Sequence, residues 1–260
     1  MLKQKFKKNK FIKNIFFLFM GAKSFFTFKP VTLFKQYIWF FQELQKFNNM
    51  DVNPNFAKIE YFPCLLDKLD HTPLDPTYFF QDSWAAKKIY DIKPKHHYDV
   101  GSSAKTIGIL SQFVPITMID IRPITLELEN LYFKKGSILE LPFEDNSIQS
   151  ISSLCVIEHI GLGRYGDPLD PYGSEKAIEE LKRVVSINGI ILFSVPIDSK
   201  NKIYFNAHRA FTRDYILKLF SGFELIEEKY QYGTKMYDVY DKSKGFGTGL
   251  YMFKKEAQCL

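Results

Sequence analysis

Two acidic residues stand at or near the ends of two short predicted strands, 21 residues apart in the sequence. Asp99 lies near the end of the run 97–100 and is followed by Gly101, whereas Asp120 closes the run 116–120. The carboxylate of Asp99 can fix a tight turn by accepting hydrogen bonds from loop amides, and Gly101 lets the backbone approach a ligand closely. An acid about 20 residues beyond such a turn is placed to bind a ribose diol. The pattern predicts a site for a ribose-bearing ligand, and the alternative is a plain turn with a surface aspartate.

Two histidines stand where neighbouring strands are expected to end. His159 follows the apolar run 150–157, and His208 lies in the segment after the run 190–195. Histidine can take up a proton at cellular pH, as a general base must. A single histidine is more often structural than catalytic, but two at the ends of adjacent strands make one of them a candidate base.

One segment satisfies the dinucleotide-binding expression G-x-G-x-x-G, through Gly161, Gly163 and Gly166. Pro168 and Pro171 exclude the helix that must hold a pyrophosphate, so we reject a nicotinamide site there. We expect an ordered loop over the ligand site instead, whose polar side chains either bind the hydroxyls of a polar substrate or only tie down the loop. The predicted acceptor-binding residues are Glu158, Arg164, Asp167, Asp170, Asn206 and Arg209.

The elements that must position these residues alternate between strand and helix. Strands are predicted at 97–100, 116–120, 131–133, 150–157, 190–195, 223–230 and 250–253. Helices are predicted at 76–92 with Asp75 as N-cap, at 103–112, from a Ser174 cap to Asn188-Gly189, and from a Thr212 cap to 220. This order predicts an α/β fold whose seven-stranded, mostly parallel sheet has helices on both faces. Ligands of such sheets bind beyond the carboxyl ends of the strands.

Composition excludes several classes of protein. Hydrophobic residues make up 46% of the 260 residues and charged residues 25%, which excludes a wholly disordered chain. Cys64, Cys155 and Cys259 lack a metal-ligand spacing, so neither a zinc site nor a disulfide framework is predicted. A reducing compartment fits best, and we expect a cytoplasmic protein.

The positive charge is concentrated at the N-terminus. Residues 1–48 contain ten lysines, one acid and fourteen aromatic residues, whereas the rest of the chain carries a net charge of −3. A nucleic-acid partner is not predicted, because the body of the chain is not basic. Three alternatives remain for this segment: a signal peptide ending near Ala22, an amphipathic arm on an anionic membrane at the inner face, or a helical extension packed on the catalytic domain. We expect residues 1–75 to form this extension and a linker, and residues 76–260 to form one domain.

Several stretches resemble the class I S-adenosylmethionine-dependent methyltransferases over about residues 97–230. The residues from Gly136 to Ser147 are similar to the common segment G-D-x-x-x-L-P-F-x-D-x-S, and 156–160 is similar to V-L-E-H-I. Ser103 stands where the second loop glycine is usual, and Ser137 where an acid is usual, although both can still form hydrogen bonds. The resemblance implies a Rossmann-like fold with S-adenosyl-L-methionine as cofactor. The residues implied to surround it are Asp99, Gly101, Ser102, Ser103, Asp120, Ser137, Ile138 and Cys155.

Three further stretches, 81–86, 161–171 and 205–209, resemble the DUF268 family. Association of that family with surface-polysaccharide pathways implies O-methylation of a sugar or glycan precursor, with His159 or His208 as the base. The alternatives are N-methylation of an amino or amide group, and a non-catalytic binding protein with this fold. Some quinone-pathway methyltransferases bind a metal through Glu-x-x-Glu-His, but Cys155 replaces the first glutamate, so we predict no metal. The oligomeric state is not predicted.

Overall fold

The computed structural model describes residues 30–51, 53–56 and 59–257, and the contacts divide the chain into two units, Met1–Pro73 and Leu74–Leu260. In the first unit, α2 spans Pro30–Asn48 and exposes aromatic side chains such as Phe34 and Phe41. The proposed signal peptide and most of the basic segment, as well as Cys259, lie outside the described residues. Among the helices that are described, none is both long and apolar enough to cross a bilayer.

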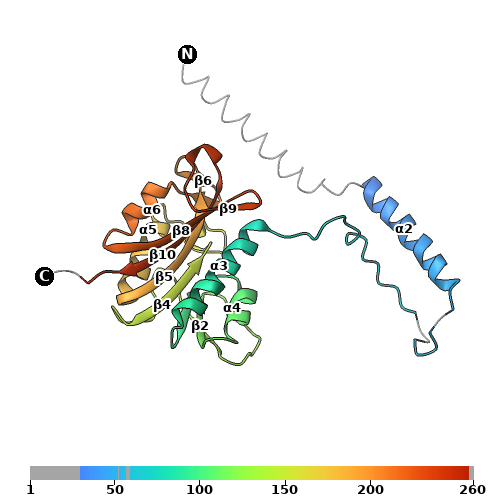
Figure 1. The fold of residues 1–260 in the computed structure, drawn as a ribbon, viewed down its shortest axis with the longest axis horizontal. Coiled ribbons are helices and arrows are strands. Elements are labelled where there is room, and N and C mark those ends of the chain that lie inside the picture. The colour runs from blue at the N-terminus through green and yellow to red at the C-terminus, as the bar shows by residue number, and fades with distance from the viewer. Residues whose placement is uncertain (1–29, 52, 57–58, 258–260) are drawn as a thin grey trace, which may run out of the picture. The chain divides into compact units, whose positions relative to one another are not determined.

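An eight-stranded sheet forms the centre of the second unit (Figure 1). Its strands are β1 His97–Val100, β2 Ile116–Asp120, β3 Leu131–Lys135, β4 Ile148–Leu154, β5 Val185–Ile197, β8 Phe223–Tyr232, β9 Lys235–Tyr237 and β10 Gly247–Lys255. They pair in the order β3-β2-β1-β4-β5-β10-β8-β9. The pairs from β3 to β5 are parallel, whereas β10 runs antiparallel to both β5 and β8.

Helices cover both faces of this sheet, as the sequence predicts (Figure 1). The helices of this unit are α3 Pro76–Ile92, α4 Ala104–Leu110, α5 Gly173–Val184 and α6 Arg213–Leu219, with 3₁₀ turns η1 Ile157–His159 and η2 Lys242–Lys244. Buried side chains of α3 and α4 pack on one face of the sheet, and those of α5 and α6 pack on the other. A separate hairpin, β6 Lys202–Tyr204 and β7 His208–Ala210, follows β5.

The start of α3 follows directly from its sequence. Asp75 is the N-cap, where its Oδ1 accepts a hydrogen bond of 2.9 Å from the amide of Thr77, and Pro76 occupies the first turn. Trp84 and Ile89 bury one face of the helix against the sheet, and Lys93 ends it in a left-handed conformation before Pro94. The predicted helix 76–92 is therefore confirmed.

Three details of the predicted elements are wrong. The sheet has eight strands rather than seven, because the three-residue strand β9 folds back on β8 and is too short to give a sequence pattern. Helix α5 begins at Gly173 with Tyr172 as its N-cap, rather than after a Ser174 cap, because the hydroxyl of Ser174 donates to the carbonyl of Ile157 at 2.6 Å. That helix ends at Val184 rather than at Asn188-Gly189, because Val185 already pairs with β4.

Candidate functional site

The chain order of the strands places the site. From β1 the sheet grows to one side through β2 and β3 and to the other side through β4 and β5, so the topological switch point lies between β1 and β4. Ligands of open α/β sheets bind beyond the carboxyl ends of the strands at that point. Asp99 lies near the end of β1 and Gly101 directly follows it, Asp120 ends β2, and Cys155 to His159 follow β4, so these predicted residues gather at this edge.

A buried polar network holds the loop after β1. The carboxylate of Asp99 accepts hydrogen bonds from the amide of Ser102 at 3.0 Å, its hydroxyl at 2.6 Å and the hydroxyl of Ser152 at 2.5 Å. The Ser102 hydroxyl also accepts a hydrogen bond from the amide of Leu154 at 3.0 Å. Burial raises the pKa of Asp99 to about 6, although the two serines lower it. Asp99 is fully buried and lines neither cavity described below, so it positions the loop rather than meeting a ligand.

His97 continues this network toward the centre of the sheet. Its two ring nitrogens lie 2.8 Å from the hydroxyl of Ser150 and 2.9 Å from that of Ser152. Because Ser152 donates its proton to Asp99, it must accept from His97 Nε2, which fixes the neutral tautomer with Nδ1 unprotonated. Burial lowers the pKa of His97 to about 3, in agreement with a neutral ring.

The backbone of this loop requires glycine at one position. Gly101 has a φ of 72°, and a Cβ atom there would lie 3.0 Å from a methyl group of Val156. Cys155, directly before Val156, also has a left-handed φ of 53°. Such conformations in a non-glycine residue cluster at functional sites. Gly101 and Cys155 both line the two cavities that meet here.

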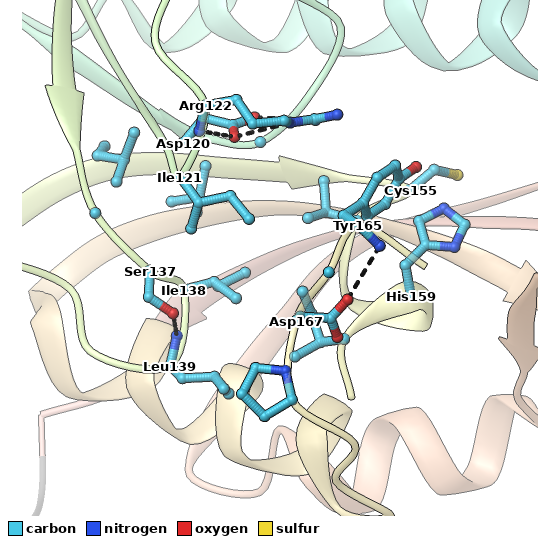
Figure 2. A pocket seen from close by; sticks show the side chains of 18 residues that line it. Asp120, Ile121, Arg122, Ser137, Ile138, Leu139, Cys155, His159, Tyr165 and Asp167 are labelled. Carbon is cyan, nitrogen blue, oxygen red and sulfur yellow. Dashed lines mark hydrogen bonds and ion pairs between the residues drawn. The ribbon is translucent and has the colours of Figure 1, made fainter. Parts of the chain in front are cut away.

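The first cavity has a volume of about 300 Å³ and lies beyond β1, β2 and β4 (Figure 2). Figure 2 shows Asp120 and Arg122 on one side of it, Ser137, Ile138 and Leu139 on another, and Tyr165 and His159 across from them. The lining residues are Val100, Gly101, Ile119, Asp120, Ile121, Arg122, Gly136, Ser137, Ile138, Leu139, Cys155, Val156, His159, Ile160, Tyr165, Gly166, Asp167 and Pro168.

Asp120 presents a carboxylate to this cavity. Its Oδ1 accepts a hydrogen bond of 2.8 Å from the amide of Arg122, and the guanidinium of Arg122 lies 3.4 Å from both carboxylate oxygens. The Arg122 side chain is 61% exposed, so this ion pair is weak and solvent-screened. The guanidinium can therefore give way to a ligand without a large cost.

An apolar wall faces Asp120. Ile138 is buried, Ile121 and Leu139 are exposed toward the cavity mouth, and the hydroxyl of Ser137 accepts a hydrogen bond of 3.1 Å from the amide of Leu139. A nucleoside has a ribose diol, which a carboxylate can bind, and a flat base, which fits an apolar slot. The first cavity therefore fits the adenosine part of S-adenosyl-L-methionine.

The second cavity adjoins the first and has a volume of about 470 Å³. Gly101, Cys155, His159 and Tyr165 line both cavities. The other residues of the second cavity are Asp75, Thr77, Tyr78, Ser102, Ser103, Leu154, Glu158, Arg164, Pro196, His208, Phe246 and Thr248. The predicted cofactor residues Ser102 and Ser103 thus lie in the second cavity, beside the wall that it shares with the first.

The two predicted catalytic histidines are both in the second cavity. The Nδ1 atom of His159 lies 2.6 Å from the carbonyl oxygen of Ala207, to which it donates, so its Nε2 atom is unprotonated in the neutral ring. Burial lowers the pKa of His159 to about 4. The ring of His208 packs against those of Tyr204 and Phe246, which also contact each other, and its Nε2 atom is buried and has no hydrogen-bond partner among the described residues. Burial lowers the pKa of His208 as well, and the charge of Arg164 lowers it further.

Glu158 is the most deeply buried ionisable group of the second cavity. It is 1% exposed, and its Oε2 atom has no hydrogen-bond partner in the part of the chain that is described. Burial raises the pKa of Glu158 to about 8.

The glycine-rich loop has no helix, as the two prolines predict: Gly161, Gly163 and Gly166 all have positive φ, and the next helix begins only at Gly173. The structure separates the residues predicted to bind the acceptor. Arg164 lines the second cavity and Asp167 the first, where Asp167 also accepts from the amide of Gly161 at 2.7 Å.

Three of the predicted acceptor residues line neither cavity. Arg209 is buried and donates to the carbonyls of Ile160 and Asp170, at 2.5 Å and 3.0 Å, so it ties the loop to β7. The Asp170 carboxylate binds Lys176 at 2.7 Å. Asn206 is exposed in the turn of the β6–β7 hairpin. These three residues are therefore not placed to bind an acceptor. The polar atoms of Arg209 and Asp170 are engaged within the protein, and Asn206 is exposed to solvent.

Several lining residues were missed by the sequence reasoning. Ile121 and Arg122 follow Asp120 directly, so adjacency could have found them. Tyr78 reaches the second cavity from α3, and Thr248 from β10, where it pairs with Pro196 in the antiparallel register. Nothing in the linear order of the chain brings these two residues to the carboxyl ends of β1 and β4.

Comparison of the sequence with protein families gives one match. Residues 133–244 match the family described as "Caenorhabditis protein of unknown function, DUF268". This region contains both predicted histidines and most residues that line the first cavity, namely those from Gly136 to Pro168. The match confirms the resemblance to DUF268. No curated protein matches the chain in sequence.

Solved structures share the fold. A protein described provisionally as a sarcosine dimethylglycine methyltransferase from Galdieria sulphuraria is 16% identical, with 70% of this chain and 86% of that chain covered and a TM-score of 0.53. The MccD protein is 14% identical, with 72% and 100% covered and a TM-score of 0.50. The Burkholderia thailandensis 1,6-didemethyltoxoflavin-N1-methyltransferase, solved with S-adenosylhomocysteine, is 13% identical, with 73% and 94% covered and a TM-score of 0.49. The first of these likenesses confirms the predicted Rossmann-like methyltransferase fold.

Proposed function

We propose that this chain, which has the class I methyltransferase fold and carries a DUF268 region, transfers a methyl group from S-adenosyl-L-methionine to a hydroxyl of a sugar or glycan precursor in surface-polysaccharide biosynthesis. The observation that carries the proposal is the pair of adjoining cavities at the switch point. The first offers a carboxylate and an apolar slot, and the second is rich in hydroxyl, imidazole and carboxyl groups.

The chain's own residues fit this cofactor. Asp120 would hold the ribose, Ser137 and Ile138 the adenine, and Gly101 with Cys155 would form the passage to the second cavity, where Ser102 and Ser103 would meet the amino-acid end. Bound there, the cofactor supplies a methyl group on a positively charged sulfur with a good leaving group. Catalysis then depends mainly on holding the acceptor in line, which the side chains that line the second cavity would do.

A hydroxyl acceptor must also lose a proton. We propose that His208 takes it, because this residue lines the second cavity and its buried Nε2 atom has no hydrogen-bond partner among the described residues. The hydrogen bond from His159 to Ala207 suits an orienting role, since it fixes the ring and its tautomer. The aromatic side chains of Tyr78, Tyr165 and Phe246 in the same cavity suit the faces of a sugar ring.

Two other functions are supported by particular residues. N-methylation of an amino or amide group would need no strong base, and the lowered pKa values of both histidines favour it. A non-catalytic protein with this fold is favoured by Ser103 and Ser137, which replace a usual glycine and a usual acid.

A two-stage experiment tests the proposed function. Thermal unfolding with excess S-adenosylhomocysteine comes first, because a ligand at a hundredfold excess over its dissociation constant stabilises the native state by about 2.7 kcal/mol. Incubation with methyl-labelled cofactor and pools of neutral sugars, amino sugars and amines follows. Label in a neutral sugar supports O-methylation, label only in amines supports the N-methyl alternative, and binding without any transfer supports the non-catalytic one.

We further propose that residues 1–75 form an extension whose basic and aromatic part, residues 1–48, holds the protein on an anionic membrane at the cytoplasmic face. The exposed aromatic side chains of α2 support this. Each lysine near such a surface contributes about 1 kcal/mol, and salt screens the attraction. Flotation with anionic liposomes is expected to recover the protein at low salt, and recovery should fall in high salt or with neutral lipid.

A matched pair of variants locates the effect. Replacing Lys3, Lys5, Lys7 and Lys8 by glutamine should abolish flotation, whereas the same replacement at Lys105, Lys200, Lys235 and Lys242 in the second unit should leave it unchanged. Equal recovery of both variants would contradict the proposal.

A further inference from the structure

Glu158 is a buried carboxyl group without the partners that a buried charge needs. It lies in η1, directly after the strand whose end meets both cavities, and it is 1% exposed. Within ion-pair distance the described residues offer it only the ring of His159, whose Nε2 atom is 3.6 Å from Oε1. That ring is neutral, because its pKa is lowered to about 4, and the Oε2 atom of Glu158 has no hydrogen-bond partner among the described residues.

The ionisable groups around Glu158 offset its burial only in part. The thiol of Cys155 hydrogen-bonds its carboxyl group and the charge of Arg164 also lowers its pKa, but burial is the larger effect. Asp75 and Tyr78 at the start of α3, Tyr165 of the loop and His208 of β7 line the same cavity. None of them supplies a cation, since burial lowers the pKa of His208. Arg164 is the one cation of the cavity lining that the structure describes, and its guanidinium donates to the carbonyl of Ala207 at 3.0 Å. An ionised carboxylate buried without a partner is costly, so the uncharged form is favoured.

We propose that Glu158 stays uncharged in the resting protein and donates a hydrogen bond to an oxygen of the acceptor. In this role it favours a neutral acceptor and does not take the acceptor's proton. This inference rests on the proposed function. A neutral carboxyl group offers one donor and a further acceptor, which matches a hydroxyl group or two neighbouring sugar oxygens. An anionic acceptor oxygen would leave a second buried negative charge uncompensated if Glu158 ever ionised, so the cavity suits an uncharged acceptor.

The direction of the pH dependence follows from the raised pKa. Ionisation begins as the pH approaches about 8, and it removes the donor and places a charge in the cavity. Acceptor binding is therefore expected to weaken above that pH. Stability changes in the same direction: the contribution of a group with a raised pKa is complete below its unfolded value of 4.5 and is lost as the pH rises through about 8.

Two variants separate a neutral donor from a general base. Glu158→Gln keeps a donor and an acceptor but cannot ionise, and Glu158→Leu keeps the approximate volume and loses both. With the neutral sugar labelled in the incubation above as probe, Glu158→Gln should keep kcat/KM within a few-fold and lose the decline above pH 8. Glu158→Leu should raise KM about tenfold or more, the effect of one lost hydrogen bond.

A spectroscopic measurement needs no acceptor. The infrared difference spectrum between the wild type and Glu158→Gln at neutral pH should contain the carbonyl stretch of a protonated carboxylic acid, and this band should vanish well above pH 8. A carboxylate band at neutral pH, or loss of turnover in Glu158→Gln, would overturn the inference. Calorimetry with S-adenosylhomocysteine distinguishes failure of the proposed function from failure of this inference. If the protein does not bind S-adenosylhomocysteine, the proposed function is refuted. The infrared band tests only the protonation of Glu158.

Discussion

Replacing Asp120 with alanine is expected to weaken binding of S-adenosylhomocysteine about a hundredfold. Asp120 is the acidic group at the end of β2 that lines the first cavity, and its carboxylate faces the space between the apolar wall and the loop (Figure 2). Two hydrogen bonds from a ribose diol to a charged group contribute about 3 kcal/mol together, which is about a hundredfold in the dissociation constant. Isothermal calorimetry measures this change directly.

Two further variants make the result specific. Asp120→Asn keeps an oxygen for the amide of Arg122, which the native Oδ1 binds at 2.8 Å, so the loop should stay in place and the affinity should fall less. Asp91→Ala removes an aspartate of α3 that pairs with Lys87 and lines neither cavity, so it is expected to leave the affinity unchanged. An unaltered dissociation constant in Asp120→Ala would remove Asp120 from the cofactor site.

Replacing His208 with phenylalanine is expected to lower kcat for the labelled sugar at least a hundredfold while leaving cofactor affinity unchanged. Phenylalanine keeps the packing against Tyr204 and Phe246 but has no nitrogen to take a proton. A positioned general base contributes about a hundredfold or more, and an interaction made only in the transition state lowers kcat and kcat/KM together. Because the pKa of His208 is lowered, the acid limb of the wild-type profile should lie below pH 6.5.

His96→Phe is the matched control for this substitution. His96 also packs against aromatic rings, those of Tyr98 and Tyr132, but it bonds Thr117 and lines neither cavity. Its turnover should equal that of the wild type. A mere twofold fall in His208→Phe would leave the reaction to positioning alone, and N-methylation would then be the better assignment.

Local signals were sufficient for the fold. The N-caps at Asp75 and Thr212, the runs at 97–100 and 116–120 and the prolines of the glycine-rich loop all correspond to observed elements or breaks. The errors arose where tertiary pairing decided the outcome. Residues 185–189 continue a helical pattern in the sequence, but Val185 pairs with Ile148 and extends β5.

The sequence could predict those site residues that lie at or just beyond the end of a predicted strand. Asp120, Ser137 and His159 line cavities because each lies at or within five residues of the carboxyl end of a parallel strand. Arg209 shows why the rest was not: its guanidinium is the same group whether it binds an acceptor or four protein oxygens, and only the folded loop distinguishes the two. The burial of Glu158, which raises the pKa of its carboxyl group, is likewise visible only in the folded structure.

The wall shared by the two cavities makes their occupancies interdependent. Gly101, Cys155, His159 and Tyr165 line both, so a molecule in one cavity alters the surface offered to a molecule in the other. Thermodynamic linkage requires that the factor by which cofactor changes acceptor affinity equals the factor by which acceptor changes cofactor affinity. Inhibition by S-adenosylhomocysteine, the product left after methyl transfer, should therefore vary with acceptor concentration.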